Sequence, residues 1–244
     1  MTDRSGLAIV DAPVQLAIID LMGTLLADDG LVARAYDAAL REAGVTSDAP
    51  EYSQAWDTIR SMAGRPTLDV LTAALTDPVR AEESTWAFDD SVLASIPDLT
   101  EIPGASDALE TLSSQGILLA LTTSFTPEVL TAVLKQAKWV DRFAISLSAR
   151  GQRRGHPAPD LLLEAILELR IDSVSQVALI GDNVADLEAG NRAGAGLVIG
   201  VRSGGVDESD LATAPHTHIV DSIVDVPAIF AAPRTTGQRR ASDD

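Results

Sequence analysis

The sequence contains no cysteine and only two lysines, Lys135 and Lys138. The lack of cysteine excludes disulfide bonds, thiolate metal sites and cysteine nucleophiles. It is also compatible with a reducing compartment, and we expect a cytoplasmic protein. Aromatic residues make up only 4% of the chain, so alanine, leucine, valine and isoleucine must build its core.

Positive charge and long apolar runs are also scarce. Asp and Glu total 36 against 18 Lys and Arg, which gives a net charge of -18. So acidic a chain repels nucleic acid and anionic membranes, and we expect neither as a partner. No run approaches the ~20 apolar residues of a membrane helix, and residues 1–6 lack the apolar core of a signal peptide. An anionic substrate would need a local cationic site, formed by a metal ion or by a few arginines.

The apolar residues that are present form short runs separated by helical patterns. Such runs are typical of strands buried on both faces of a parallel sheet. We expect strands at 16–19, 117–121, 143–147, 177–180 and 197–201. Helices are expected between them, for example at 105–114 and 159–169. This alternation predicts an α/β fold with a Rossmann-like parallel-sheet core.

A long segment without any strand pattern interrupts this alternation. Residues 28–99 have helical spacing with breaks such as Gly64-Arg65-Pro66, and we predict an inserted α-helical cap there. The α/β core would then consist of residues 15–27 and 100–231. We expect a flexible lead-in at 1–14 and a disordered polar tail at 232–244.

Acidic and hydroxyl side chains follow three of the predicted strands. Asp20 ends the first, Thr123-Ser124 follow the second, and Asp182 follows the fourth, with Asp186 four residues later. Each could be an ordinary turn or helix-capping residue. Parallel strands, however, end at the same edge of a sheet, where ligands bind. Three carboxylates meeting there would repel one another unless a hard cation such as Mg²⁺ joined them.

These motifs resemble the haloacid dehalogenase superfamily of hydrolases. The matching features are Asp-x-x-Gly-Thr-Leu at 20–25, the hydroxyl pair, and Gly-Asp-x-x-x-Asp at 181–186. The helical insertion corresponds to that superfamily's mobile cap. Within it, the segments 28–32, 155–160 and 181–196 are most similar to the phosphonatase-like branch, which is related to phosphonoacetaldehyde hydrolase.

The resemblance implies a role for each matching position. Asp20 would attack phosphorus and form an aspartyl-phosphate, and Thr123 with Ser124 would hold phosphate oxygens. Asp20, Asp182 and the backbone carbonyl of Met22 would bind Mg²⁺, with Asp186 supporting that site. The hydroxyl of Thr24 could pin the turn or the neighbouring carboxylate.

Three departures from the family pattern limit these roles. Superfamily phosphatases have an aspartate for general acid–base catalysis two residues after the nucleophile, where this chain has Met22. The cap lysine that forms a Schiff base in phosphonoacetaldehyde hydrolase is replaced by Thr67, so we reject that activity. The basic residue expected after the third strand is represented by His156 or by Arg154.

The hypothesis that follows is Mg²⁺-dependent hydrolysis of a small anionic metabolite, phosphorylated or phosphonylated, through Asp20. Gly64 and Arg65 are candidate substrate contacts on the cap loop. A dehalogenase-like hydrolase is an alternative, supported by Met22 and Asn183 and opposed by Asp182. A third possibility is a degenerate member of the fold that only binds a ligand or partner. The sequence leaves the choice between monomer and homodimer open.

Overall fold

The computed structural model describes residues 13–149 and 153–231. The predicted tail at 232–244, and the lead-in apart from its last two residues, lie outside the described residues.

Six parallel strands form one sheet in the order β3-β2-β1-β4-β5-β6. The strands are β1 (Leu16–Asp20), β2 (Leu118–Thr123), β3 (Ile145–Ser148), β4 (Val177–Gly181), β5 (Leu197–Val201) and β6 (His218–Val220). The predicted α/β fold with a Rossmann-like parallel sheet is confirmed. Two strands begin later than predicted. Ile117 precedes β2, and Phe143 precedes β3, where its ring packs edge-on against Trp139.

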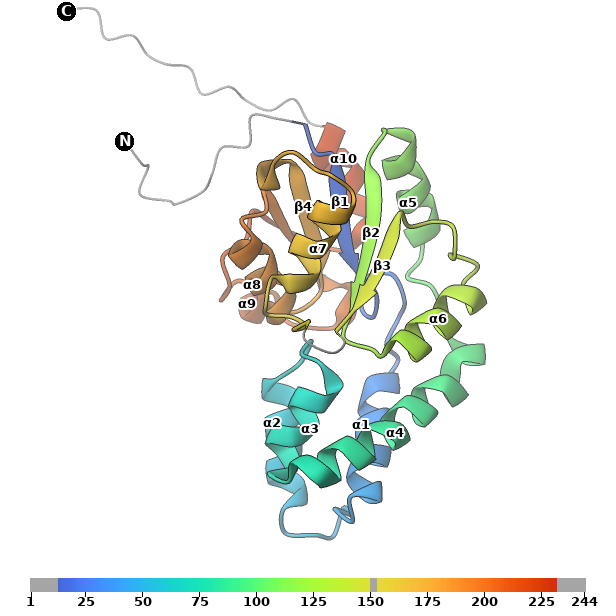
Figure 1. The fold of residues 1–244 in the computed structure, drawn as a ribbon, viewed down its shortest axis with the longest axis vertical. Helices are drawn as coiled ribbons and strands as arrows, with labels where there is room; N and C mark the ends of the chain where they lie inside the picture. The colour runs from blue at the N-terminus through green and yellow to red at the C-terminus, as the bar shows by residue number, and fades with distance from the viewer. Residues whose placement is uncertain (1–12, 150–152, 232–244) are drawn as a thin grey trace, which may run out of the picture.

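The sheet is buried on both faces, as its apolar strands require. Along β1, Ala17 and Ile19 belong to one apolar cluster, which includes α5 and α6, while Leu16 and Ile18 belong to a second, which includes α7 and α8. Figure 1 shows α7 and α8 on the same side of the sheet. The core helices are α5 (Ala105–Ser114), α6 (Pro127–Gln136), α7 (Asp160–Glu168), α8 (Val184–Ala193), α9 (Glu208–Leu211) and α10 (Val226–Ala231). Short 3₁₀ turns lie at Ile96–Asp98, Val174–Gln176, Arg202–Gly204 and Ile223–Asp225.

The segment predicted as an insertion is helical throughout. It contains α1 (Leu31–Glu42), α2 (Tyr52–Ser61), α3 (Thr67–Leu75) and α4 (Pro78–Ser95), with no strand in residues 28–99, all of which are described. These helices lie beyond the carboxyl ends of the strands (Figure 1). Their division from the core as a separate cap remains a prediction. No helix in the described ranges is long and apolar enough to cross a bilayer.

The helical insertion is tied to the core by contacts that include those of its connecting segments and of helix α4. Its incoming and outgoing segments run side by side, because the backbone N–H of Ala27 donates to the carbonyl of Thr100 at 2.9 Å. Further along, the ring of Phe88 on α4 packs 6.2 Å from that of Phe125, and the hydroxyl of Thr126 donates to Asp89 at 2.9 Å. The insertion therefore covers the end of the sheet where the acidic residues lie.

Candidate active site

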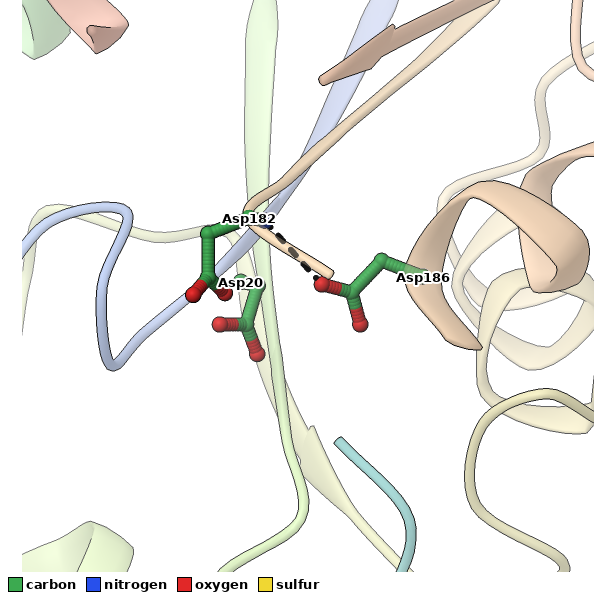
Figure 2. A group of neighbouring side chains, drawn as sticks. All are labelled: Asp20, Asp182 and Asp186. Atoms are coloured by element: carbon green, nitrogen blue, oxygen red, sulfur yellow. Dashed lines mark hydrogen bonds between the residues drawn. The ribbon is translucent and has the colours of Figure 1, made fainter. Parts of the chain in front are cut away.

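Three carboxylates meet at the carboxyl end of the central strands. Asp20 is the last residue of β1 and lies opposite Thr122 of β2, while Asp182 directly follows β4 on the other side of β1. With Asp186, they place one carboxylate oxygen each within 4.8 Å of one another, and all three side chains are buried. Figure 2 shows the three carboxyl groups from two strand ends and one helix converging. The structure thus brings together the acids that the sequence analysis singled out.

Asp186 is fixed by the way α8 begins. Asn183 caps the helix by accepting from the backbone N–H groups of Ala185 and Asp186 at 3.1 and 3.4 Å. In return, Oδ2 of Asp186 accepts from the backbone N–H groups of Asp182 and Asn183, both at 3.2 Å. This capping box holds the loop that carries Asp182 against the helix.

His156 is hydrogen-bonded to the other carboxylate oxygen of Asp186. Its Nδ1 lies 2.7 Å from Oδ1 of Asp186, and the imidazole is almost completely buried. Its Nε2 is also buried, without a hydrogen-bond partner in the described part of the chain. The structure therefore places His156 behind the acidic cluster as a partner of Asp186.

The electrostatics of the cluster are unfavourable without a counter-charge. Burial raises the pKa of Asp20 well above its usual value, and repulsion from Asp186 and Asp182 raises this pKa further. Burial also raises the pKa of Asp182, with repulsion from Asp186 adding to it. Several carboxylate oxygens around one buried point are the donor set that a hard divalent cation such as Mg²⁺ prefers. The residues present fit such an ion.

Two glycines form a close backbone cradle around the carboxylate of Asp182. A Cβ atom built on Gly204 would lie 1.8 Å from Oδ2 of Asp182, and one built on Gly23 would lie 2.2 Å from the same atom. Gly23 also has a φ of 79°, which only glycine adopts readily. Neither position can carry a side chain without displacing Asp182.

The hydroxyl residues predicted at this site have different surroundings. Thr123 is buried at the end of β2, and its Oγ1 accepts from the backbone N–H of Phe125 at 3.3 Å. Thr123 and Ser124 both line the cavity in front of Asp20. Thr24 does not pin the turn or the carboxylate as expected, because its buried Oγ1 has no hydrogen-bond partner among the described residues.

A cavity of about 260 Å³ separates the acidic cluster from the helices of the insertion. Its polar end contains Asp20 and Asp182, with the side chain of Met22 beside them. The opposite wall is mostly apolar and includes Val32, Tyr36, Trp56, Ile59 and Phe88.

The loop between α2 and α3 closes one side of this cavity. A Cβ atom on Gly64 would lie 2.0 Å from Oδ1 of Asn183, and one on Gly155 would lie 2.5 Å from Cγ of Pro66. The loop therefore rests directly on the core at two glycines. Arg65 of this loop lines the cavity, and its guanidinium has no ion-pair or hydrogen-bond partner among the described residues.

Arg154, the other predicted basic residue, points elsewhere. Its guanidinium makes two hydrogen bonds to Asp160, at 2.7 and 3.1 Å, and 72% of the side chain is exposed. Arg154 is not among the residues that line the cavity. The structure therefore does not bring it to the acidic cluster.

Comparison with known proteins identifies the family. The family model described as haloacid dehalogenase-like hydrolase matches residues 14–194, which is most of the chain. The chain belongs to this family. The match includes the helical insertion and all three acids of the cluster, and so agrees with the resemblance found in the sequence.

Individual members of the haloacid dehalogenase-like family have low sequence identity to this chain. Phosphonoacetaldehyde hydrolase of Parabacteroides distasonis is 30% identical over 139 residues, covering 55% of this chain and 53% of that protein. The chain thus matches about half the length of such curated relatives. Phosphoglycolate phosphatase of Nitrosospira multiformis is 26% identical, covering 75% of this chain and 81% of that protein. A crystal structure of a hydrolase from Pseudomonas syringae superposes with a TM-score of 0.77 at 24% identity, covering 90% and 98% of the two chains, and so shares the fold.

Some site residues of this family member were missed by sequence reasoning. Gly204 was not singled out, although Ser203-Gly204-Gly205 directly follows β5 at the same sheet edge and could have signalled a close backbone approach. Trp56 gave no usable signal, since an aromatic residue on an amphipathic helix is usually part of a core. Its place in the cavity depends on how α2 packs over the sheet.

Proposed function

We propose that this protein is a Mg²⁺-dependent hydrolase of small phosphate monoesters that acts through Asp20. The observation that supports this most directly is the buried three-carboxylate cluster opening into a cavity at the carboxyl edge of the sheet. A nucleophilic carboxylate splits the hydrolysis into two easier steps through a covalent intermediate. The names of the relatives, which include phosphatases and phosphonoacetaldehyde hydrolases, support the same class of reaction.

The ion would be held by Asp20, Asp182 and the backbone carbonyl of Met22. Asp186 supports this site rather than binding the ion, because its oxygens are engaged by two backbone N–H groups and by His156. When bound, Mg²⁺ would neutralise charge on the nucleophile and on the phosphate, and it would offset the burial and mutual repulsion that raise the pKa values of Asp20 and Asp182.

The chain's own residues bind and orient the substrate. Thr123, Ser124 and neighbouring backbone N–H groups hold phosphate oxygens at the end of β2. Arg65 supplies positive charge from the α2–α3 loop, a role for which Arg154 is badly placed because it is bound to Asp160. His156 positions Asp186 and, through it, the loop that carries Asp182. The loop at Gly64 keeps water away from the reacting groups when it rests on Asn183.

A panel of small phosphate esters assayed for phosphate release tests this proposal. We expect turnover that requires Mg²⁺, is abolished by EDTA, and is lost in Asp20→Asn. Asp172→Asn is the matched control, because Asp172 is exposed at the opposite, amino end of β4 and should leave turnover unchanged. Turnover of 2-haloacids in EDTA would instead indicate dehalogenase chemistry. Stabilisation by phosphate and Mg²⁺ without turnover would indicate a binding protein.

A further inference from the structure

The absence of a proton donor beside Asp20, together with the apolar wall of the cavity, restricts the substrates that this site can cleave. Resting on the proposed function, we propose that the substrate is an aryl phosphate, a phosphate monoester of a compact, one-ring phenol. The argument has two independent parts, one from the chemistry of the leaving group and one from the shape and polarity of the cavity.

The chemical part concerns the oxygen that leaves phosphorus. An alkoxide is a poor leaving group unless an acid protonates it, and general acid catalysis typically contributes ~10²–10⁴-fold in rate. Met22, which stands two residues after the proposed nucleophile Asp20, lines the cavity and cannot donate a proton. A phenoxide, whose conjugate acid has a pKa near ~10, can leave without this help.

Among the described residues that line the cavity, no other side chain is arranged to act as the acid. Burial raises the pKa of Tyr36, so its hydroxyl holds its proton more tightly than a free tyrosine does. Asp28 serves as an acceptor, since its Oδ1 receives the backbone N–H of Val32 at 2.8 Å at the start of α1. The arginines on the wall do not release protons at accessible pH.

The second part concerns what the helices present to the leaving group. The wall formed by the helices is mostly apolar and offers a sugar or polyol few hydrogen-bond partners; it includes Val32, Tyr36, Trp56, Ile59 and Phe88. A buried hydroxyl without a partner costs about 1–3 kcal/mol, so polyhydroxylated substrates are disfavoured. The cavity volume of about 260 Å³ is slightly below the ~300–1,000 Å³ of drug-sized ligand sites. The cavity is therefore expected to hold a phosphate group and a single ring.

The reaction balances without an added acid. The Asp20 carboxylate forms an O–P bond while the P–O(aryl) bond breaks, and the electron pair leaves on the phenoxide, which takes a proton from solvent after departure. A water molecule then forms a bond to phosphorus, the pair of the P–O(Asp20) bond returns to the carboxylate, and the water proton moves to a phosphate oxygen. The products are a phenol and inorganic phosphate.

A leaving-group series tests the chemical part. With substituted phenyl phosphates, Mg²⁺ and the full chain, we expect kcat/KM to fall by about three- to tenfold for each unit rise in phenol pKa, because the loose transition state places charge on the departing oxygen. Met22→Asp supplies the missing acid and should flatten this dependence and raise activity on alkyl phosphates. Met22→Asn, which is similar in size and cannot transfer a proton, should not.

Two results would overturn the inference while leaving the proposed function intact. One is turnover of alkyl or sugar phosphates as fast as phenyl phosphate, with a flat leaving-group dependence. The other is a steeper dependence in Asp28→Asn than in the unaltered protein, which would identify Asp28 as the acid. Failure to turn over any phosphate compound, acetyl phosphate included, would overturn both proposals.

Trp56 provides the test of the apolar wall. Trp56→Ala should raise KM for phenyl phosphate by about tenfold, as expected for the loss of an aromatic contact. The KM for acetyl phosphate, which lacks a ring, should not change, and Trp56→Phe should restore most of the difference. Binding gives a second readout, since phenylphosphonate should raise the melting temperature of Asp20→Asn more than methylphosphonate does. Equal shifts by the two phosphonates, or equal KM changes for the two substrates, would contradict the assignment.

Discussion

Replacing Asp182 by asparagine should stabilise the metal-free protein at neutral pH. Asp182 shares a buried site with two other carboxylates, with oxygens within 4.8 Å of one another. Two unit charges at 4.8 Å and an effective dielectric constant near 20 repel by about 3.5 kcal/mol. Because a carboxyl group with a raised pKa can take up a proton and escape part of this cost, we expect a gain of about 1–3 kcal/mol in the free energy of unfolding.

The sign of the pH dependence follows from the raised pKa of Asp182. A group with a raised pKa in the folded state contributes stability below its unfolded value of 3.8 and loses it as pH rises through the folded value. The gain in the free energy of unfolding from Asp182→Asn should therefore be absent near pH 4 and increase towards pH 7. Thermal unfolding in EDTA measures it, since 1 kcal/mol corresponds to about 2–4 °C in a protein of this size.

Asp160→Asn is the control of opposite sign. The pKa of Asp160 is lowered, chiefly by its hydrogen bond to Arg154, so its contribution is present at neutral pH and lost on acidification. This variant should be slightly less stable than the unaltered protein at pH 7. Adding Mg²⁺ should stabilise the unaltered protein and Asp160→Asn, but not Asp182→Asn. A destabilised Asp182→Asn in EDTA at pH 7 would refute the reasoning, because it would show that the cluster needs its charge to fold.

Three further substitutions test the close contacts around the site. Gly204→Ala should weaken Mg²⁺ binding, measured by titration calorimetry, because its Cβ would fall 1.8 Å from Asp182. Gly200→Ala should not, because its Cβ would make only ordinary contacts at 3.6 Å. Gly155→Ala should push Pro66 away and raise KM in the phosphatase assay, since the added Cβ would lie 2.5 Å from its ring; an unchanged KM would show that loop closure does not control binding. Thr126→Ala should lower the free energy of unfolding by about 1 kcal/mol through loss of the α6 cap, and Thr126→Ser should retain it in denaturant unfolding.

Much of the fold could be predicted because its local signals agree with one another. The strand at β1 is a short apolar run buried on both faces. Helix α6 begins at Pro127 with Thr126 as its cap, a start that these two residue types favour. The limits of β3 were less certain because its signal is weak. Phe143, which was included in the predicted strand, packs against Trp139 instead of entering the sheet. An aromatic residue is compatible with a buried strand and with a loop that packs on the core, and only tertiary contacts determine which of the two it joins.

The acidic cluster was predictable for a topological reason, and its basic partner was not. Parallel strands carry their terminal residues to one edge, so Asp20 and Asp182 were expected at the same edge once the strands were recognised. They are close neighbours because β1 and β4 pair directly, which the structure shows. Which cation faces them depends on side-chain direction in loops, which sequence spacing does not determine. Arg154 is bound to Asp160, and His156 lies behind Asp186. Arg65 of the insertion lines the cavity, and its guanidinium has no partner in the part of the chain that the structure describes.

The paired connecting segments of the helical insertion have a consequence for how such proteins diversify. The segment that enters the helical insertion and the segment that leaves it are hydrogen-bonded to each other, with the N–H of Ile102 donating to the carbonyl of Leu25 at 2.9 Å. The helical insertion lies between these two segments, so its two ends are adjacent in space. Exchange of this insertion with that of another member would leave the strand register and the three acids untouched. We therefore expect that substrate choice, which we assign to the insertion, can change without altering the acids that we assign to bond breaking.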